Sequence, residues 1–233
     1  MPPMIVRIGG ILVFLSIAAG IAAIAVYLAA TTGWDAETDL VVRERSYRSA
    51  MKTEAWIIQL VVTLVPAAVA AVFWTTWGFF RAFDRKAAKT PTIAIAIVAT
   101  LLTAIQATFW IFEDDFVAAL FTMMLPIFAS FLFFPLLIWF SIAVFLFGRD
   151  ADSLLWKAVG IVYLAGMIPA GAGLVWRWAG GAPIESLIAI VGAIVLGGWI
   201  CHGIALILGA GRMARALSSE AAVHPLGGPG ESD

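Results

Sequence analysis

The chain has few charged residues and almost no cysteine. Only 12% of its 233 residues are charged, about half of the fraction that soluble proteins use to cover their surface. A single cysteine, Cys201, excludes disulfides within the chain and a cysteine-rich metal site. The net charge of −1 offers no basic face, which argues against nucleic acid as a partner.

Motifs that carry known chemistry are also missing from the sequence. It contains no H-E-x-x-H, no G-x-S-x-G, no Walker A sequence and no G-x-G-x-x-G. His202 is the only histidine in an apolar run, and we interpret it as an interior histidine with satisfied hydrogen bonds. We therefore expect no catalytic residue, no metal site and no cofactor.

Long apolar runs are what the sequence has instead. Hydrophobic residues make up 63% of the chain, and its mean hydropathy is +1.02. A helix rises 1.5 Å per residue, so about 20 apolar residues cross a hydrocarbon core of roughly 30 Å. The sequence predicts an all-α, polytopic transmembrane helical bundle over residues 1–211 and a disordered cytoplasmic tail over 212–233. The expected spans are 4–31, 55–80, 92–112, 116–147, 154–176 and 184–209.

The distribution of cations predicts the orientation of these spans. Cytoplasmic segments of membrane proteins carry an excess of lysine and arginine. If the N-terminus lies inside, nine cations fall on the cytoplasmic side and five on the outer side. We therefore expect both termini in the cytoplasm. The compact length and the composition rich in alanine, glycine and tryptophan favour a bacterial inner membrane.

The clearest packing signal lies in the last span, where small residues recur every four positions. Such a stripe lets another helix approach closely. We interpret it as a seam between helices of this chain, and the shorter stripe of Ser16, Gly20 and Ala23 is a candidate partner for it. The alternative is that the stripe docks another subunit. Its members are Ala189, Ala193, Gly197, Cys201, Ala205 and Gly209.

A second group of residues is a candidate solute path. Pro126 and Pro135 interrupt the hydrogen bonding of the fourth span, which is either one kinked span or a re-entrant segment followed by a span. Gln106 is a polar side chain in the third span, and Glu113, Asp114 and Asp115 form an acidic mouth. A bend in a long helix, interhelical hydrogen bonding and stabilisation of a helix N-terminus explain the same residues without transport.

These observations predict a non-catalytic integral subunit, or an assembly component, of a larger bacterial inner-membrane complex. Its expected partners are the lipid bilayer and other integral membrane subunits. The alternative is a small-solute transporter or channel component whose path follows the fourth span.

Overall fold

The computed structural model describes residues 2–31, 63–83, 85–109, 116–178 and 185–223, and it is helical throughout these ranges apart from short turns. Five helices are α1 (Pro3–Thr31), α3 (Lys86–Phe109), α4 (Phe116–Asp150), α5 (Leu154–Trp178) and α6 (Glu185–Val223). A further helix covers Thr63–Ala82. All six contain a segment long and apolar enough to cross a membrane. The chain is therefore an all-helical, multi-pass membrane protein that contacts lipid, as the apolar runs predicted.

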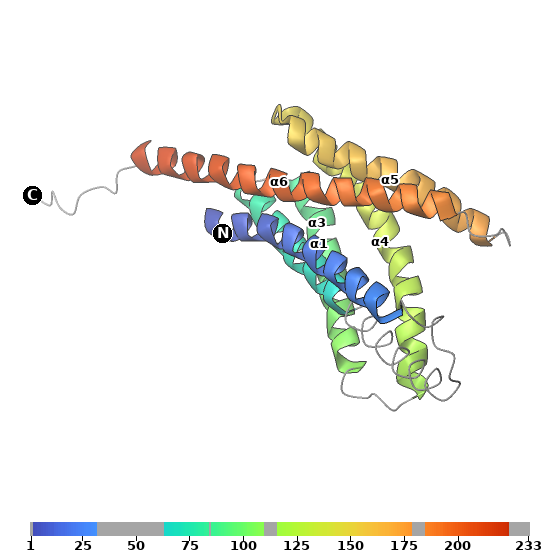
Figure 1. The fold of residues 1–233 in the computed structure, drawn as a ribbon. Helices are drawn as coiled ribbons and strands as arrows, with labels where there is room; N and C mark the ends of the chain where they lie inside the picture. Colours follow the sequence, from blue (N-terminus) through green and yellow to red (C-terminus); the bar gives the residue numbers. More distant parts are fainter. Residues whose placement is uncertain (1, 32–62, 84, 110–115, 179–184, 224–233) are drawn as a thin grey trace, which may run out of the picture.

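Helices that follow one another in the chain pack side by side. α3 packs on α4, α4 on α5 and α5 on α6, and α6 also packs on α1. Figure 1 shows that α1 begins at the end of the bundle toward which α6 runs. We call this end the terminal end. Toward the other end, the α5–α6 pair diverges from α3 and α4 (Figure 1).

The Thr63–Ala82 helix occupies the centre of the bundle, and we call it the central helix. Contacts reach it from each of the other five helices. Gly9 of α1 lies beside Thr75. Two contacts are hydrogen bonds, from Trp74 to Thr100 of α3 at 3.0 Å and between Thr76 and His202 of α6 at 2.9 Å. Two are ring contacts, with centroid distances of 4.9 Å between Phe73 and Phe140 of α4 and 5.2 Å between Phe79 and Trp156 of α5.

Most of the fully buried apolar side chains that the structure describes lie in the halves of the helices nearest the terminal end, which we call the terminal half. They include Val6, Val13, Val72, Phe80, Ile95, Phe140, Val144, Val159 and Leu206, each with 0% exposure. In the outer half of α1, Ile21 is exposed. Among the residues whose burial the structure describes, the fully buried side chains gather directly around the site described below.

Two helix boundaries differ from those expected. α3 begins at Lys86 rather than at residue 92. For the fourth span two alternatives were open, and α4 is one continuous helix from Phe116 to Asp150. We expected a disordered tail from residue 212, but α6 continues to Val223. The reason is that hydropathy marks the part of a helix in lipid, whereas segments rich in alanine, lysine and arginine remain helical in water. Residues 224–233 lie outside the described residues.

A tight turn connects α4 to α5 and fixes the start of α5. The Ser153 N–H donates to the Gly148 carbonyl at 2.8 Å, and the Asp152 N–H donates to the Arg149 carbonyl at 3.3 Å. This is the pairing of a Schellman motif. Asp152 takes the left-handed position with φ of 44°, which aspartate tolerates better than most residues. The turn places Ser153 and Trp156 at the terminal end.

Candidate functional site: a buried histidine and the cavity beside it

His202 lies in the middle of the packed region and has no exposed surface. Its Nε2 atom is 2.9 Å from the Thr76 hydroxyl of the central helix. Its Nδ1 atom is 3.4 Å from the Tyr163 hydroxyl of α5. The imidazole therefore joins three helices through its two ring nitrogens, as a satisfied interior histidine should.

The direction of these hydrogen bonds follows from counting donors. The Thr76 hydroxyl has one proton, and it donates this proton to the Val72 carbonyl at 2.7 Å. Its oxygen must therefore accept from the Nε2–H of His202. Nδ1 is then the acceptor for the Tyr163 hydroxyl. With a neutral imidazole, a continuous chain of hydrogen bonds runs from Tyr163 through His202 and Thr76 to the Val72 carbonyl.

Aromatic rings enclose the imidazole. Five ring centroids lie 5.6 to 6.1 Å from that of His202, and they belong to Phe73, Phe140, Trp156, Tyr163 and Trp199. Most of these contacts are edge-to-face, the arrangement that the ring quadrupoles favour. The polar chain is thus surrounded by packed rings, and we call the whole assembly the histidine centre.

A hydrogen bond extends the histidine centre to α1. The indole N–H of Trp199 donates to the Ser16 hydroxyl at 3.0 Å, and the Ser16 hydroxyl donates to the Val13 carbonyl at 2.7 Å. Ser16, which was expected to be part of a packing stripe, therefore acts as a hydrogen-bond acceptor between α1 and α6. A buried indole in a membrane needs such a partner.

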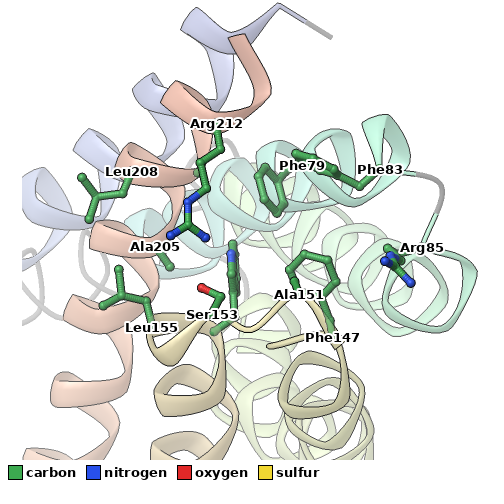
Figure 2. A pocket seen from close by; sticks show the side chains of 12 residues that line it. Phe79, Phe83, Arg85, Phe147, Ala151, Ser153, Leu155, Ala205, Leu208 and Arg212 are labelled. Carbon is green, nitrogen blue, oxygen red and sulfur yellow. The ribbon is translucent and has the colours of Figure 1, made fainter. Parts of the chain in front are cut away.

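A cavity of about 270 Å³ lies beside the histidine centre at the terminal end, and we call it the terminal cavity. Trp156 belongs to both, because its ring contacts His202 and also lines the cavity. The lining comes from the central helix and the turn after it, the α4–α5 turn and α6 (Figure 2). Its members are Phe79, Phe83, Arg85, Phe147, Ala151, Ser153, Leu155, Trp156, Ala205, Leu208, Gly209 and Arg212.

The described residues that line the terminal cavity carry two positive charges and no negative charge. Arg85 and Arg212 line it, and no acidic residue is among the described lining residues. The two carboxylates of the nearby α4–α5 turn lie within ion-pair distance of other cations. Asp150 lies 3.5 Å from Arg149, and Asp152 lies 3.0 Å from Lys157.

The predicted stripe of small residues is divided among several environments. Gly197 faces Val162 of α5, and a Cβ added at Gly209 would lie 2.8 Å from Phe79 of the central helix. Ala205 is buried beside the terminal cavity, Cys201 is half-buried and Ala193 is exposed. The side chain of Ala189 lies outside the described residues. The stripe therefore does not meet one partner helix along its length.

The closest approach of α6 to α1 uses a glycine outside the stripe. A Cβ on Gly10 would lie 2.6 Å from the Gly203 carbonyl oxygen, and one on Gly203 would lie 3.0 Å from the Val13 side chain. Gly20, expected to share this role, has nothing within 4 Å of a built Cβ. The side chain of Ala23 lies outside the described residues. The two helices pack together, but at Gly10 and Gly203.

Of the candidate solute path, the structure describes the side chains of Gln106 and Pro135, and neither lines the terminal cavity. Gln106 is 3% exposed on α3, and Pro135 is exposed on α4. Pro126 lies within α4, but its side chain is outside the description. Glu113, Asp114 and Asp115 lie outside the described residues as well.

Sequence reasoning missed the partners of His202 and the terminal cavity. The available signal was the central helix segment from Phe73 to Phe80, in which two threonines stand among five aromatic residues. Two polar side chains inside such a run require polar partners on other helices. The cavity had no comparable signal, because Arg85 and Arg212 are far apart in the chain and resemble ordinary flanking cations.

Comparisons with known proteins add no family to this description. No protein-family model matches the chain, and no curated protein or solved structure is significantly similar to it.

Proposed function

We propose that the chain is a non-catalytic integral subunit or assembly component of a larger complex in a bacterial inner membrane, with both termini in the cytoplasm. The orientation is supported by the nine cations that the helix directions and the turns between them assign to the terminal end. They are Arg7, Arg81, Arg85, Lys86, Lys89, Arg149, Lys157, Arg212 and Arg215. An excess of this kind is typical of the cytoplasmic side.

The observation that carries the subunit proposal is the exposure of Trp139. This side chain is 47% exposed on α4. It precedes Arg149 by about ten helical residues, which places it about 15 Å deep, near the middle of the hydrocarbon core. Its indole N–H has no hydrogen-bond acceptor in the part of the chain that the structure describes. Lipid tails offer none, and an unpaired polar group there is costly.

The other tryptophan placed deep in a span behaves differently. Trp199 donates its N–H to Ser16 of this chain. An acceptor on another protein would do the same for Trp139. We infer that the partner is an integral membrane helix that presents a serine or threonine hydroxyl, or a free backbone carbonyl, at mid-membrane depth.

The surroundings of Trp139 form one exposed face of α4. Its members are spaced three and four residues apart, which is the spacing of a helix–helix seam. Leu132 is 57% exposed and Ile142 is 46% exposed. We call this the α4 face, and it consists of Leu132, Pro135, Trp139, Ile142 and Leu146.

The closed histidine centre supports a static role for the bundle. Its hydrogen-bonding groups satisfy one another, and packed rings surround them. Moving helices past one another to carry a solute would break this chain of hydrogen bonds.

Photo-crosslinking tests the proposal directly. A photoreactive phenylalanine derivative placed at Ile142 on the α4 face should crosslink in membranes to one integral protein. The same group at Ile161, which is 54% exposed on α5, is the control and should give no such product. Trp139→Phe keeps an aromatic ring but removes the N–H, so it should reduce co-purification of that partner after mild detergent extraction.

Two results would contradict the subunit proposal. One is a purified chain that is a monodisperse monomer or homodimer, with no crosslink to a different protein from position 142. The other is a Trp139→Phe variant that retains its partner as well as the unchanged chain does. Trp74→Phe is a matched control, since its N–H already has an internal acceptor in Thr100.

One observation favours transport as a second candidate, namely the burial of Gln106 in α3. A polar side chain of this kind can line a solute path. If transport is the function, Gln106→Leu should abolish solute uptake in cells that depend on this protein. Trp139→Phe should leave that uptake unchanged. The reverse result would favour the subunit.

A further inference from the structure

The terminal cavity has the features of an anion site at a membrane boundary. Figure 2 shows Arg212 reaching from α6 toward Ser153, with Arg85 on the opposite side of the cavity near Phe147. Two guanidinium groups from distant parts of the chain therefore border one hollow of about 270 Å³. Guanidinium groups bind phosphate through paired N–H donors, more specifically than a lysine ammonium can.

Nothing acidic among the described lining residues balances these two charges. The carboxylates of the adjacent turn lie beside Arg149 and Lys157 instead. In the part of the chain that the structure describes, neither Arg85 nor Arg212 forms an ion pair. An anion from outside the chain would supply the missing negative charge.

The start of α5 adds to the positive potential of the terminal cavity. Its first turn supplies Leu155 and Trp156, and the preceding residue, Ser153, adds a hydroxyl group. Ser153 is itself only 5% exposed. Backbone N–H groups in the first turn of a helix have no partner within the helix and carry partial positive charge. The N-terminus of α5, a 25-residue helix, therefore adds partial positive charge beside the cavity that the two arginines line.

The rest of the lining is apolar and continues onto the lipid-facing surface. Phe79, Phe147 and Trp156 line the side toward the histidine centre, and Leu208 is 56% exposed on α6. A ligand with a charged group and an attached hydrocarbon portion matches this division. The volume of about 270 Å³ lies just below the roughly 300–1,000 Å³ of cavities for drug-sized ligands, which is consistent with a smaller group such as a phosphate with a glycerol unit.

We propose that the terminal cavity binds the phosphate ester of an anionic phospholipid. Arg212, beside Ser153, contacts the phosphate oxygens, Arg85 adds positive charge from the opposite side of the cavity, and the glycerol and upper acyl chain lie along the aromatic lining and Leu208. Basic pockets between transmembrane helices commonly hold such headgroups. A soluble phosphate ester presents the same charged group without acyl chains, so the experiment must separate the two sources.

The experiment uses the full chain purified in an uncharged detergent. Thermal unfolding is followed by intrinsic fluorescence while phosphatidylglycerol, phosphatidylcholine, glycerol 3-phosphate or inorganic phosphate is titrated. We expect phosphatidylglycerol to raise the unfolding temperature at concentrations where phosphatidylcholine does not. Arg212→Gln should weaken the apparent affinity about tenfold, the loss expected for one charge-assisted contact, and Arg85→Gln should weaken it by less because Arg85 lies on the far side of the cavity. Arg7→Gln is the matched control, because Arg7 is exposed on α1 and does not line the cavity.

Each outcome supports or contradicts the phospholipid proposal. A shift with phosphatidylglycerol that both cavity variants weaken and Arg7→Gln preserves supports the lipid. A shift with glycerol 3-phosphate or inorganic phosphate alone, with the same dependence on Arg85 and Arg212, supports the phosphate site but assigns a soluble ligand. If no phosphate compound shifts the wild-type chain, or if Arg7→Gln weakens the effect equally, the proposal is wrong. The subunit proposal is unaffected, since this measurement involves no partner protein.

Discussion

Two glycines of α1, one in each half of the bundle, lie in different packing environments. In the terminal half, a Cβ on Gly10 would lie 2.6 Å from the backbone oxygen of Gly203. Farther along the same helix, a Cβ on Gly20 would meet nothing within 4 Å. Both glycines look alike in the sequence. Only the first is required for helix contact, so a small residue in a membrane helix does not by itself identify a seam.

Two threonines, one in each half, also differ in how their hydroxyl groups are bonded. In the terminal half, Thr76 bonds across the bundle to His202 as well as to its own helix. Thr103, in the outer half of α3, donates to the Ala99 carbonyl of its own helix at 2.8 Å. A hydroxyl that bonds within one helix is satisfied in lipid without fixing a neighbour. Thr76 therefore helps to fix the position of α6, whereas the hydroxyl group of Thr103 fixes no neighbouring helix.

The largest effect should come from filling the closest helix contact. Gly10→Leu places a side chain against the α6 backbone, which cannot move without separating the two helices. We expect it to lower the free energy of unfolding by about 3 kcal/mol, at the upper end of overpacking effects. Denaturant titration of the protein in detergent, followed by circular dichroism, measures this loss.

The same substitution at Gly20 is its matched control. Gly20→Leu should change the free energy of unfolding by less than about 0.5 kcal/mol, because nothing lies near the added atoms and leucine favours helix over glycine. Equal losses at both positions would show that the halves do not differ in packing.

A smaller effect should follow from removing one hydroxyl of the histidine centre. Thr76→Val keeps the shape of the side chain but leaves the Nε2–H of His202 buried without an acceptor. We expect a loss of about 2 kcal/mol, the cost of an unsatisfied buried donor. Thr103→Val should lose less than about 0.5 kcal/mol, since its hydroxyl serves only its own helix.

Thr76→Ser separates the hydrogen bond from the methyl group. It retains the acceptor and should recover most of the stability lost in Thr76→Val. If Thr76→Ser loses as much free energy of unfolding as Thr76→Val, then Thr76 contributes through packing of its methyl group and not through the hydrogen bond.

The sequence predicted the six spans because the apolar length needed to cross lipid is a strong and local signal. Helix ends were less predictable. Residues 212–223 carry charges and were assigned to a disordered tail, yet they continue α6, because helix formation does not require burial in lipid.

The candidate site depended on information that one sequence does not contain. His202 was predicted as an interior histidine, but its partners Thr76 and Tyr163 come from other helices, and only the packing reveals the pair. Arg85 and Arg212 become neighbours of one cavity because the central helix and α6 end together. Periodicity of small residues identified α6 as a packing helix, but not which of its faces meets α1.

The smallest effect should come from the surface of the α4–α5 turn, where the terminal half meets water. The carboxylate of Asp152 lies 3.0 Å from Lys157 but is 96% exposed. Asp152→Asn removes the charge and keeps a residue that tolerates the left-handed backbone. We expect it to lower the free energy of unfolding by less than about 0.5 kcal/mol, and this difference should vanish in 1 M salt because the pair is screened.

Asp152→Ala tests the backbone at the same position. Alanine has no side chain that offsets the left-handed conformation at φ of 44°, so we expect a loss of about 1 kcal/mol that salt does not remove. Denaturant titrations of the unchanged chain and of both variants, each at low and high salt, give the four differences needed. A loss from Asn as large as that from Ala, and sensitive to salt, would mean that charge pairing and not the Schellman turn fixes α5 beside the terminal cavity. In that case surface electrostatics would hold the terminal half as much as its packing does.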